Sequence, residues 1–282
     1  MGFRSAVLAV AHLKRLHGGS QPHLLYGADR RFYVVKFTNN PQGRRILVNE
    51  LLVSRLAQRI GLPVPRAVVI EVCHDLIARS PNLTIETIGG SIPCAAGIHF
   101  GTELINGSDA VSDFLPDHEL QKAARVCHFF AGALALDKWT GNTDFRQAIF
   151  VEHRGRNSLE VKFIDNGMCF DGDEWSFRDK PAHGVYQSSA VYRADRCRQD
   201  CTPWLRKIEA LTREDILRCG QDVPAAWVEG EEESFHGLMS DLARRRASVR
   251  KLVANSISGW IKRSPSPQQG IRSSLREALK VA

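Results

Sequence analysis

Two aspartates in different loops are the residues of this sequence that most clearly point to chemistry. Asp144 lies in the polar loop 141–147, and Asp165 ends an apolar, strand-like run just before Gly167. They are 21 residues apart, which is enough for one hairpin to return both carboxylates to the same end. Two such carboxylates repel each other unless a cation lies between them, and Mg²⁺ prefers oxygen ligands. The pair therefore predicts a magnesium site, although each aspartate could instead cap a turn.

A lysine and a glutamate nearer the N-terminus can form a charged pair. Lys36 stands among bulky β-forming residues (YVVKF), so its ammonium could reach phosphate oxygens if that face of the strand lines a cleft. A plain edge-strand lysine is the alternative. Glu50 falls within the apolar stripe of a predicted helix, where an unpaired carboxylate is costly unless it reaches water at the margin of the stripe. A salt bridge between Lys36 and Glu50 would remove that cost.

A short turn precedes the lysine. Gly27 and Asp29 belong to a predicted hairpin turn just ahead of Lys36. Successive backbone N–H groups in such a turn can cover phosphate oxygens, so the two residues are candidates for nucleotide binding. The turn contains one glycine only, and an ordinary hairpin turn explains it equally well.

Hydrophobic periodicity and turn residues predict the elements that must position these groups. The first half contains a hairpin over 24–37, a helix over 43–60 that ends at Gly61, a strand over 66–72 and a glycine-rich connector over 89–107. The second half contains a helix over 117–138, strands over 148–151 and 159–164, a helix that starts at Thr212 with Asp215, and a helix opened by Ser234.

This order of elements predicts an α+β chain with two lobes. We expect a β-rich N-terminal lobe over residues 1–100, a mainly helical C-terminal lobe over 101–263, and a flexible tail over 264–282. Strands with one helix, a connector, a long helix, a loop, a hairpin and further helices also follow one another in protein kinases.

Composition narrows the class of protein. The chain is 43% hydrophobic and 24% charged, which is typical of a globular protein, and no stretch approaches the ~20 apolar residues of a membrane span. Its seven cysteines are scattered and odd in number, which favours a reducing cytoplasm over a disulfide framework. A net charge of +7, concentrated partly in residues 244–251, keeps binding to nucleic acid open as a less favoured alternative.

Four short motifs, taken together in this order, resemble the HipA-like kinases. They are VVK at Lys36, Glu50 ahead of GLPVP, the loop WTGNTD that ends at Asp144, and IDNG with Asp165. The resemblance implies a two-lobed fold related to phosphatidylinositol kinases and protein kinases, with ATP and Mg²⁺ between the lobes. It further implies that Lys36 holds ATP phosphates, Glu50 orients Lys36, Asp144 is the catalytic base and Asp165 binds magnesium.

One position departs from the pattern of that family. The family commonly has an asparagine five residues after the catalytic aspartate, and this chain has Ile149 there. Gln147 or Asn142 is predicted to supply the missing amide oxygen to the metal.

The sequence thus predicts an ATP-dependent kinase that transfers the γ-phosphate to a hydroxyl of a protein, a lipid or a small molecule. A pseudokinase-type binding module is the alternative that Ile149 motivates. A hydrolase that uses Asp144 and Asp165 as its two carboxylates is less favoured, because Lys36 and Glu50 would then have no function.

Overall fold

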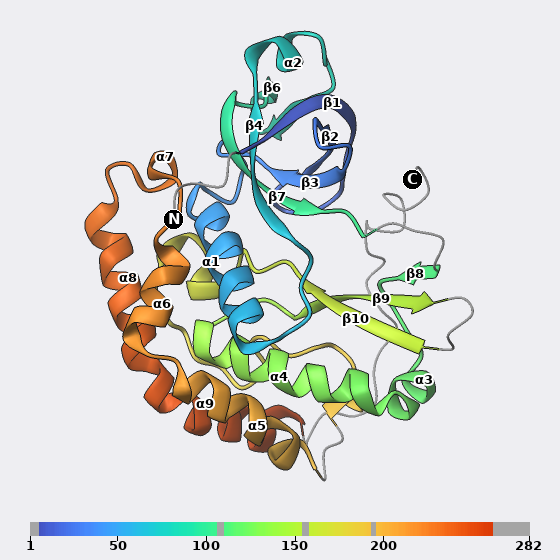
Figure 1. Ribbon diagram of the computed structural model, residues 1–282, viewed down its shortest axis with the longest axis vertical. Coiled ribbons are helices and arrows are strands. Elements are labelled where there is room, and N and C mark those ends of the chain that lie inside the picture. Colours follow the sequence, from blue (N-terminus) through green and yellow to red (C-terminus); the bar gives the residue numbers. More distant parts are fainter. Residues whose placement is uncertain (1–5, 106–109, 154–157, 193–195, 262–282) are drawn as a thin grey trace.

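A closed five-stranded barrel and a group of helices form the two parts of the chain (Figure 1). The computed structural model describes residues 6–105, 110–153, 158–192 and 196–261 of the 282-residue chain. The elements of the first part are β1 (Val7–Arg15), β2 (His23–Gly27), β3 (Phe32–Lys36), α1 (Arg45–Ile60), β4 (Ala67–Val72), α2 (His74–Ala78), β5 (Thr84–Thr87), β6 (Gly90–Pro93) and β7 (Gly97–Glu103).

The barrel has the strand order β1-β2-β3-β7-β4, and β1 closes it by pairing in parallel with β4. Side chains alternate along β3 with the period of two that a strand imposes. Tyr33 and Val35 are fully buried in the barrel core, whereas Val34 and Lys36 face the opposite side and line a cleft. The position of Lys36 within this strand therefore decides that its ammonium points out of the barrel.

Two of the barrel strands are absent from the sequence-based prediction. β1 was not predicted, and β7 lies inside the stretch 89–107 that was expected to be a connector. β7 (GIHFGTE) contains two glycines, which weaken a strand signal. Gly101 is nevertheless required, because a Cβ there would lie 2.4 Å from Cγ1 of Ile70 on the neighbouring β4. Packing of the Ile70 side chain directly against the backbone of β7, rather than a loop, explains this glycine.

The predicted hairpin and the first helix are confirmed. β2 and β3 pair antiparallel, and α1 ends at Ile60 with Gly61 in the left-handed conformation at φ 84°. Only glycine adopts that conformation without a steric cost, so Gly61 ends the helix as its position in the sequence indicated. Twelve of the sixteen residues of α1 are buried, which makes it a core helix on which both parts of the chain pack.

The second part begins with a small sheet and a buried helix. Its elements are β8 (Ala110–Ser112), α3 (Asp117–Lys122), α4 (Ala124–Thr140), β9 (Gln147–His153), β10 (Ser158–Ile164), α5 (Cys197–Ala210), α6 (Arg213–Gly220), α7 (Ala225–Val228), α8 (Glu232–Arg245) and α9 (Val249–Ser256). The sheet has the order β10-β9-β8 and lies between the barrel and α4 (Figure 1).

Three helix boundaries test the predictions for this part. The expected helix over 117–138 is two helices, because Ala123 leaves the helical conformation with ψ 69°. Thr212 and Asp215 form the predicted capping box at the start of α6. Ser234 lies inside α8, which begins two residues earlier at Glu232, so its prediction as the helix opener is wrong.

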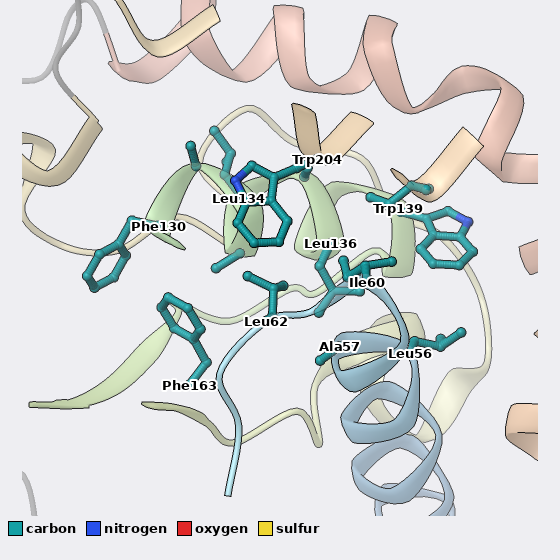
Figure 2. Packing of buried hydrophobic residues seen from close by; sticks show 14 of the residues in the cluster. Leu56, Ala57, Ile60, Leu62, Phe130, Leu134, Leu136, Trp139, Phe163 and Trp204 are labelled. Atoms are coloured by element: carbon teal, nitrogen blue, oxygen red, sulfur yellow. The ribbon is translucent and has the colours of Figure 1, made fainter. Parts of the chain in front are cut away.

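The largest core cluster joins α1, α4, the β9–β10 hairpin and the C-terminal helices. Trp139 of α4 and Trp204 of α5 belong to this cluster together with Leu56, Ile60 and Leu62 (Figure 2). α4 is apolar on all sides and nearly all of its residues are buried, so it is the central helix of this part. The loop 141–146 follows its C-terminal end and leads into β9 at the edge of the site.

α7 connects the helical part to the barrel. Trp227 is completely buried, and its indole N–H donates to the carbonyl of Ile98 in β7 at 2.8 Å. Leu47 and Phe100 belong to the same cluster. β7 itself continues to Glu103, three residues past the predicted lobe boundary at residue 100, because it completes the barrel between β3 and β4.

Within the described part of the chain, no helix has the length and apolar character needed to cross a membrane. The predicted tail over 264–282 falls outside the described residues.

Candidate active site

A cleft lies between the barrel and the β9–β10 hairpin. Residues of the β1–β2 turn, β3, the end of β7, β9 and β10 line it, and two further residues come from α1 and from the segment between α1 and β4. They are Leu16, His17, Pro22, Val34, Lys36, Glu50, Pro65, Thr102, Glu103, Leu104, Ile105, Gln147, Ile149, Ile164 and Asp165. The lining is mostly apolar, and its charged members include three residues that contact one another.

Lys36 joins two carboxylates that come from different parts of the chain. Its Nζ lies 2.5 Å from Oε1 of Glu50 in α1 and 2.9 Å from Oδ1 of Asp165 after β10. Glu50 is buried, whereas about a third of the Asp165 side chain is exposed. The structure therefore brings together three of the predicted site residues, and it leaves one of them accessible from the cleft.

The charges of this group stabilise one another. Burial opposes the charge on Lys36, but Asp165 and Glu50 outweigh it and raise the pKa of Lys36 above its usual value. Burial likewise acts against ionisation of Asp165, but Lys36 overcomes it and lowers the pKa of that carboxyl. At neutral pH the site thus holds a fixed ammonium beside an ionised carboxylate.

Gln147 reaches the second oxygen of Asp165. Its Nε2 donates to Oδ2 of Asp165 at 2.8 Å, from the first residue of β9. An amide presents an oxygen and an NH₂ group at nearly the same position, so a half-turn of the side-chain amide would place Oε1 there. The pair offers a cation one carboxylate and one amide oxygen from adjacent strands.

Asp144 and Asn142 lie in the loop that follows α4. Asp144 is exposed, and its Oδ1 accepts from the backbone N–H of Phe145. Asn142 is buried, and its side chain already bonds at both ends: Nδ2 donates to Asp137, and Oδ1 accepts from the backbone N–H of Asp144. Asn142 thus holds the loop in place. The structure does not bring its oxygen to Asp165.

A hydrogen-bonded residue pair fixes this loop beside the loop of Asp165. Thr143 donates to the carbonyl of Met168 through its backbone N–H at 3.0 Å and through Oγ1 at 3.2 Å. The loop that carries Asp144 therefore lies alongside the segment that follows Asp165, because both aspartates flank the open end of the β9–β10 hairpin, where Gln147 pairs with Ile164.

A buried ion pair, which the sequence reasoning missed, supports both loops. Arg146 and Asp137 form a double contact and are at most 2% exposed. Asp137 raises the pKa of Arg146 despite the opposing effect of burial. Nη1 of Arg146 also donates to the carbonyls of Ile164 and Asp165 at 2.8 and 3.3 Å. The signal was present as an arginine two residues after Asp144, but its partner lies near the end of a mostly apolar helix, nine residues earlier in the chain.

The turn at Gly27 and Asp29 lies at the end of β3 that is farther from Lys36. It joins β2 to the start of β3, whereas Lys36 is at the other end of that strand. Asp29 accepts a hydrogen bond from the hydroxyl of Tyr33 at 2.6 Å, and neither residue lines the cleft. Their predicted role in nucleotide binding is therefore not supported by their position.

The turn between β1 and β2, over residues 16–22, lies at the cleft instead. Leu16, His17 and Pro22 line the cleft, and the turn contains Gly18 and Gly19. The sequence signal was the run HGGSQP, which is a better phosphate-covering turn than one with a single glycine. It was missed because β1, the strand before it, was not predicted.

Ile149 lies in the wall of the cleft. It is 5% exposed and stands two residues after Gln147 in β9, on the same face of the strand. A branched hydrocarbon side chain cannot bind a cation, so the amide nearest to Asp165 in this wall is that of Gln147.

The chain has a β-rich and a helical part, and the cleft between them holds the Lys36–Glu50 pair and Asp165. This arrangement is kinase-like. A structural comparison agrees with this class. A Helicobacter pylori proinflammatory kinase, CtkA, matches with a TM-score of 0.57 and 13% identity, over 91% of this chain and 100% of that one. Two weaker likenesses cover 90–92% of this chain: the Golgi casein kinase (TM-score 0.48, 10% identity, 73% of that chain) and hydra Fam20 with sugar (TM-score 0.47, 12% identity, 88% of that chain).

The family follows from the sequence. The family model of HipA-like kinases matches residues 10–257, which is most of the chain. The protein belongs to the HipA-like kinase family. A search of curated protein sequences finds no match.

Proposed function

We propose that this protein is an ATP-dependent kinase that uses magnesium to transfer the γ-phosphate of ATP to a hydroxyl group. The observation that carries the proposal is the contact of Lys36 with both Glu50 and Asp165 in the cleft, with Gln147 on the other oxygen of Asp165. Phosphoryl transfer requires a cation on the phosphates, oxygen ligands for a metal and a group that accepts a proton. The residues of this cleft and its adjoining loop provide each of these.

The donor set fits a hard divalent cation. Asp165 offers a carboxylate and Gln147 an amide oxygen, and Mg²⁺ is usually held by one or two carboxylates together with substrate phosphates. Among the described residues, no group of three His, Cys, Asp or Glu side chains could hold a metal alone. Phosphate oxygens would therefore complete the coordination. When bound, the metal neutralises charge that develops on the phosphates.

Different residues of the chain bind the phosphates, bind the adenine ring and accept the proton. Lys36, kept protonated by its two carboxylates, binds phosphate oxygens, and Glu50 fixes the direction of its side chain. Apolar residues of the cleft, such as Val34 and Ile164, can enclose the adenine ring. Asp144, exposed in the adjacent loop, would accept the proton of the incoming hydroxyl.

A thermal-shift experiment tests the nucleotide site. A ligand that binds only the folded state raises its stability by RT ln(1 + [L]/Kd), about 2.7 kcal/mol at a hundredfold excess over Kd. We expect ATP with magnesium to raise the Tm of the wild type and to have little effect on Asp165→Ala. The same shift in both proteins would refute the assignment of Asp165.

Turnover is tested separately with Asp144→Ala. This change should abolish phosphate transfer but preserve the ATP-induced shift, because Asp144 contacts neither Lys36 nor Asp165. Gln147→Leu should weaken the magnesium dependence of the shift, whereas Gln147→Glu, which retains an oxygen ligand, should preserve it. Transfer that survives Asp144→Ala would overturn the assignment of the base.

A binding module without turnover is the second candidate. The observation in its favour is Ile149 in the cleft wall, where relatives of this family commonly have an amide. In that case ATP would raise the Tm of the wild type, and no hydroxyl substrate would be phosphorylated.

Binding to nucleic acid gains no support from the basic C-terminal helices. Arg244, Arg245 and Arg250 form ion pairs with Asp241, Asp179 and Glu209, respectively. Charges that are already paired on the protein surface attract phosphates less strongly than free ones.

We also propose a cytoplasmic location. In support of it, all seven cysteines are free thiols, as expected for a protein in a reducing compartment.

A further inference from the structure

The segment that carries Asp165 has an unusual backbone. Asp165, Phe170, Asp171 and Trp175 all have positive φ, between 48° and 61°, and Gly172 has φ 66°. Each such L-residue costs on the order of 1 kcal/mol or more relative to ordinary conformations, so the surrounding structure must hold the segment in place. We call residues 165–175 the metal loop.

One buried side chain of α1 makes four hydrogen bonds to this loop. Asn49 is completely buried, and its Nδ2 donates to three carbonyls of the metal loop, those of Gly167, Cys169 and Gly172, at 2.8, 3.0 and 2.8 Å. Its Oδ1 accepts from the indole N–H of Trp175 at 2.9 Å. An amide NH₂ has two N–H groups, so at least one of them serves two carbonyls. Asn49 therefore binds the loop at four points along its length.

The next residue of the same helix makes a fifth contact. Oε2 of Glu50 accepts from the backbone N–H of Asn166 at 3.0 Å, while its other oxygen contacts Lys36. The loop also comes very close to the helix, since a Cβ on Gly167 would lie 2.8 Å from Cγ2 of Ile46. One turn of α1 thus holds both the lysine that faces the phosphates and the loop of the metal ligand.

We propose that Asn49 is a positioning residue for metal binding: it fixes the backbone of the metal loop so that the carboxylate of Asp165 stands in the cleft beside Gln147. The inference rests on the proposed function of the cleft. Asn49 touches neither the nucleotide nor the metal, and it acts through carbonyls two, four and seven residues after Asp165. Neither leucine nor alanine can replace it, because both lack the donors that three inward-facing carbonyls need.

The test compares the magnesium dependence of ATP binding among variants. Wild type, Asn49→Ala, Asn49→Leu and Trp175→Phe are titrated with magnesium at fixed ATP, and the Tm shift is followed. Loss of groups that orient a metal ligand typically weakens metal affinity about 10- to 100-fold. We therefore expect the half-saturating magnesium concentration of the Asn49 variants to rise at least about tenfold. Trp175→Phe should shift it in the same direction by less.

A matched control separates positioning from stability. Nζ of Lys207 donates to the carbonyl of Ile60 at 2.9 Å and thereby supports the opposite end of α1. Lys207→Met should lower the Tm without ligand but leave the half-saturating magnesium concentration unchanged. If the Asn49 variants do not fold, the comparison rests on Trp175→Phe, which removes the indole donor to Asn49 together with one ring of the side chain.

The outcomes are distinguishable. An unchanged half-saturating concentration in folded Asn49→Ala, or in Trp175→Phe when the Asn49 variants do not fold, would overturn the inference while the proposed function stands. An equal rise in Lys207→Met would also overturn it, because general loosening of α1 would then explain the effect. A wild type without any magnesium-dependent shift would overturn the proposed function, and this inference with it.

Discussion

Removal of either partner of the Arg146–Asp137 pair should cost a large part of the stability of the protein. The two side chains are 2% and 0% exposed, so water cannot solvate the charge that remains. Truncation of one partner of a buried ion pair typically costs about 3–5 kcal/mol. In Arg146→Met the carbonyl of Ile164 also loses its 2.8 Å donor. Since a domain is stable by about 5–15 kcal/mol in total, we expect a loss of at least about a fifth of that stability.

Replacement of both partners should cost less than the sum of the single changes. Arg146→Met with Asp137→Leu leaves no isolated charge in the core, and hydrophobic residues often replace a buried pair at little cost. The remaining loss then reflects the bonds from Arg146 to Ile164 and from Asn142 to Asp137. A double-mutant cycle measures this coupling, which we expect to reach several kcal/mol, at the upper end for residues in contact.

Urea unfolding followed by circular dichroism is the assay. The midpoint at constant slope reports the change in the free energy of unfolding. Arg250→Met provides the control, because Arg250 forms its ion pair with Glu209 at the surface with side chains 49% and 32% exposed. Exposed pairs contribute about 1 kcal/mol or less. Single changes at Arg146 and Asp137 that cost no more than this control, or strictly additive effects, would refute the reasoning.

Three further predictions concern the nucleotide site, pH and a helix cap. Lys36→Met should remove most of the ATP-induced Tm shift, because Lys36 is the one lysine or arginine among the described residues that line the cleft, and it contacts Asp165; an unchanged shift would contradict the assignment. Burial lowers the pKa of His23 and of His99 from 6.5 to about 4, so stability should fall as pH drops from 6.5, by about 3 kcal/mol per histidine at pH 4. His99→Gln should flatten a plot of Tm against pH, and an equally steep plot would argue against this cause. Thr212→Ala should cost about 1 kcal/mol in urea unfolding through loss of the capping box.

Local signals in the sequence were enough for much of the fold. Gly61, the capping box at Thr212 and the β2–β3 hairpin depend on residues within a few positions of one another, so their chemistry can be read directly. Strands that exist because of distant partners were missed. β7 is a weak strand by composition, and it is held in the barrel between β3 and β4.

The candidate site shows the same difference between local sequence signals and contacts of distant segments. Lys36 and Glu50 were predicted to pair because an inward carboxylate needs a partner, and the structure places them in contact. Asp165 was predicted to share a magnesium ion with Asp144, and the structure places Nζ of Lys36 at 2.9 Å from it. Gly27 and Asp29 were assigned to the phosphates because they lie close to Lys36 in sequence. In the closed barrel, Leu16, His17 and Pro22 of the β1–β2 turn line the cleft instead.

The sequence by itself determined the residue types of the site, the family and the order of elements, because spacing and hydrophobic periodicity are local properties. Only the tertiary structure decided which side chains support that site. Arg146 meets Asp137, and Asn49 meets carbonyls 118 to 123 residues further along the chain. No pattern of neighbouring residues encodes such contacts. They arise because α1 and α4 pack against the same loop, where every buried polar group must find a partner.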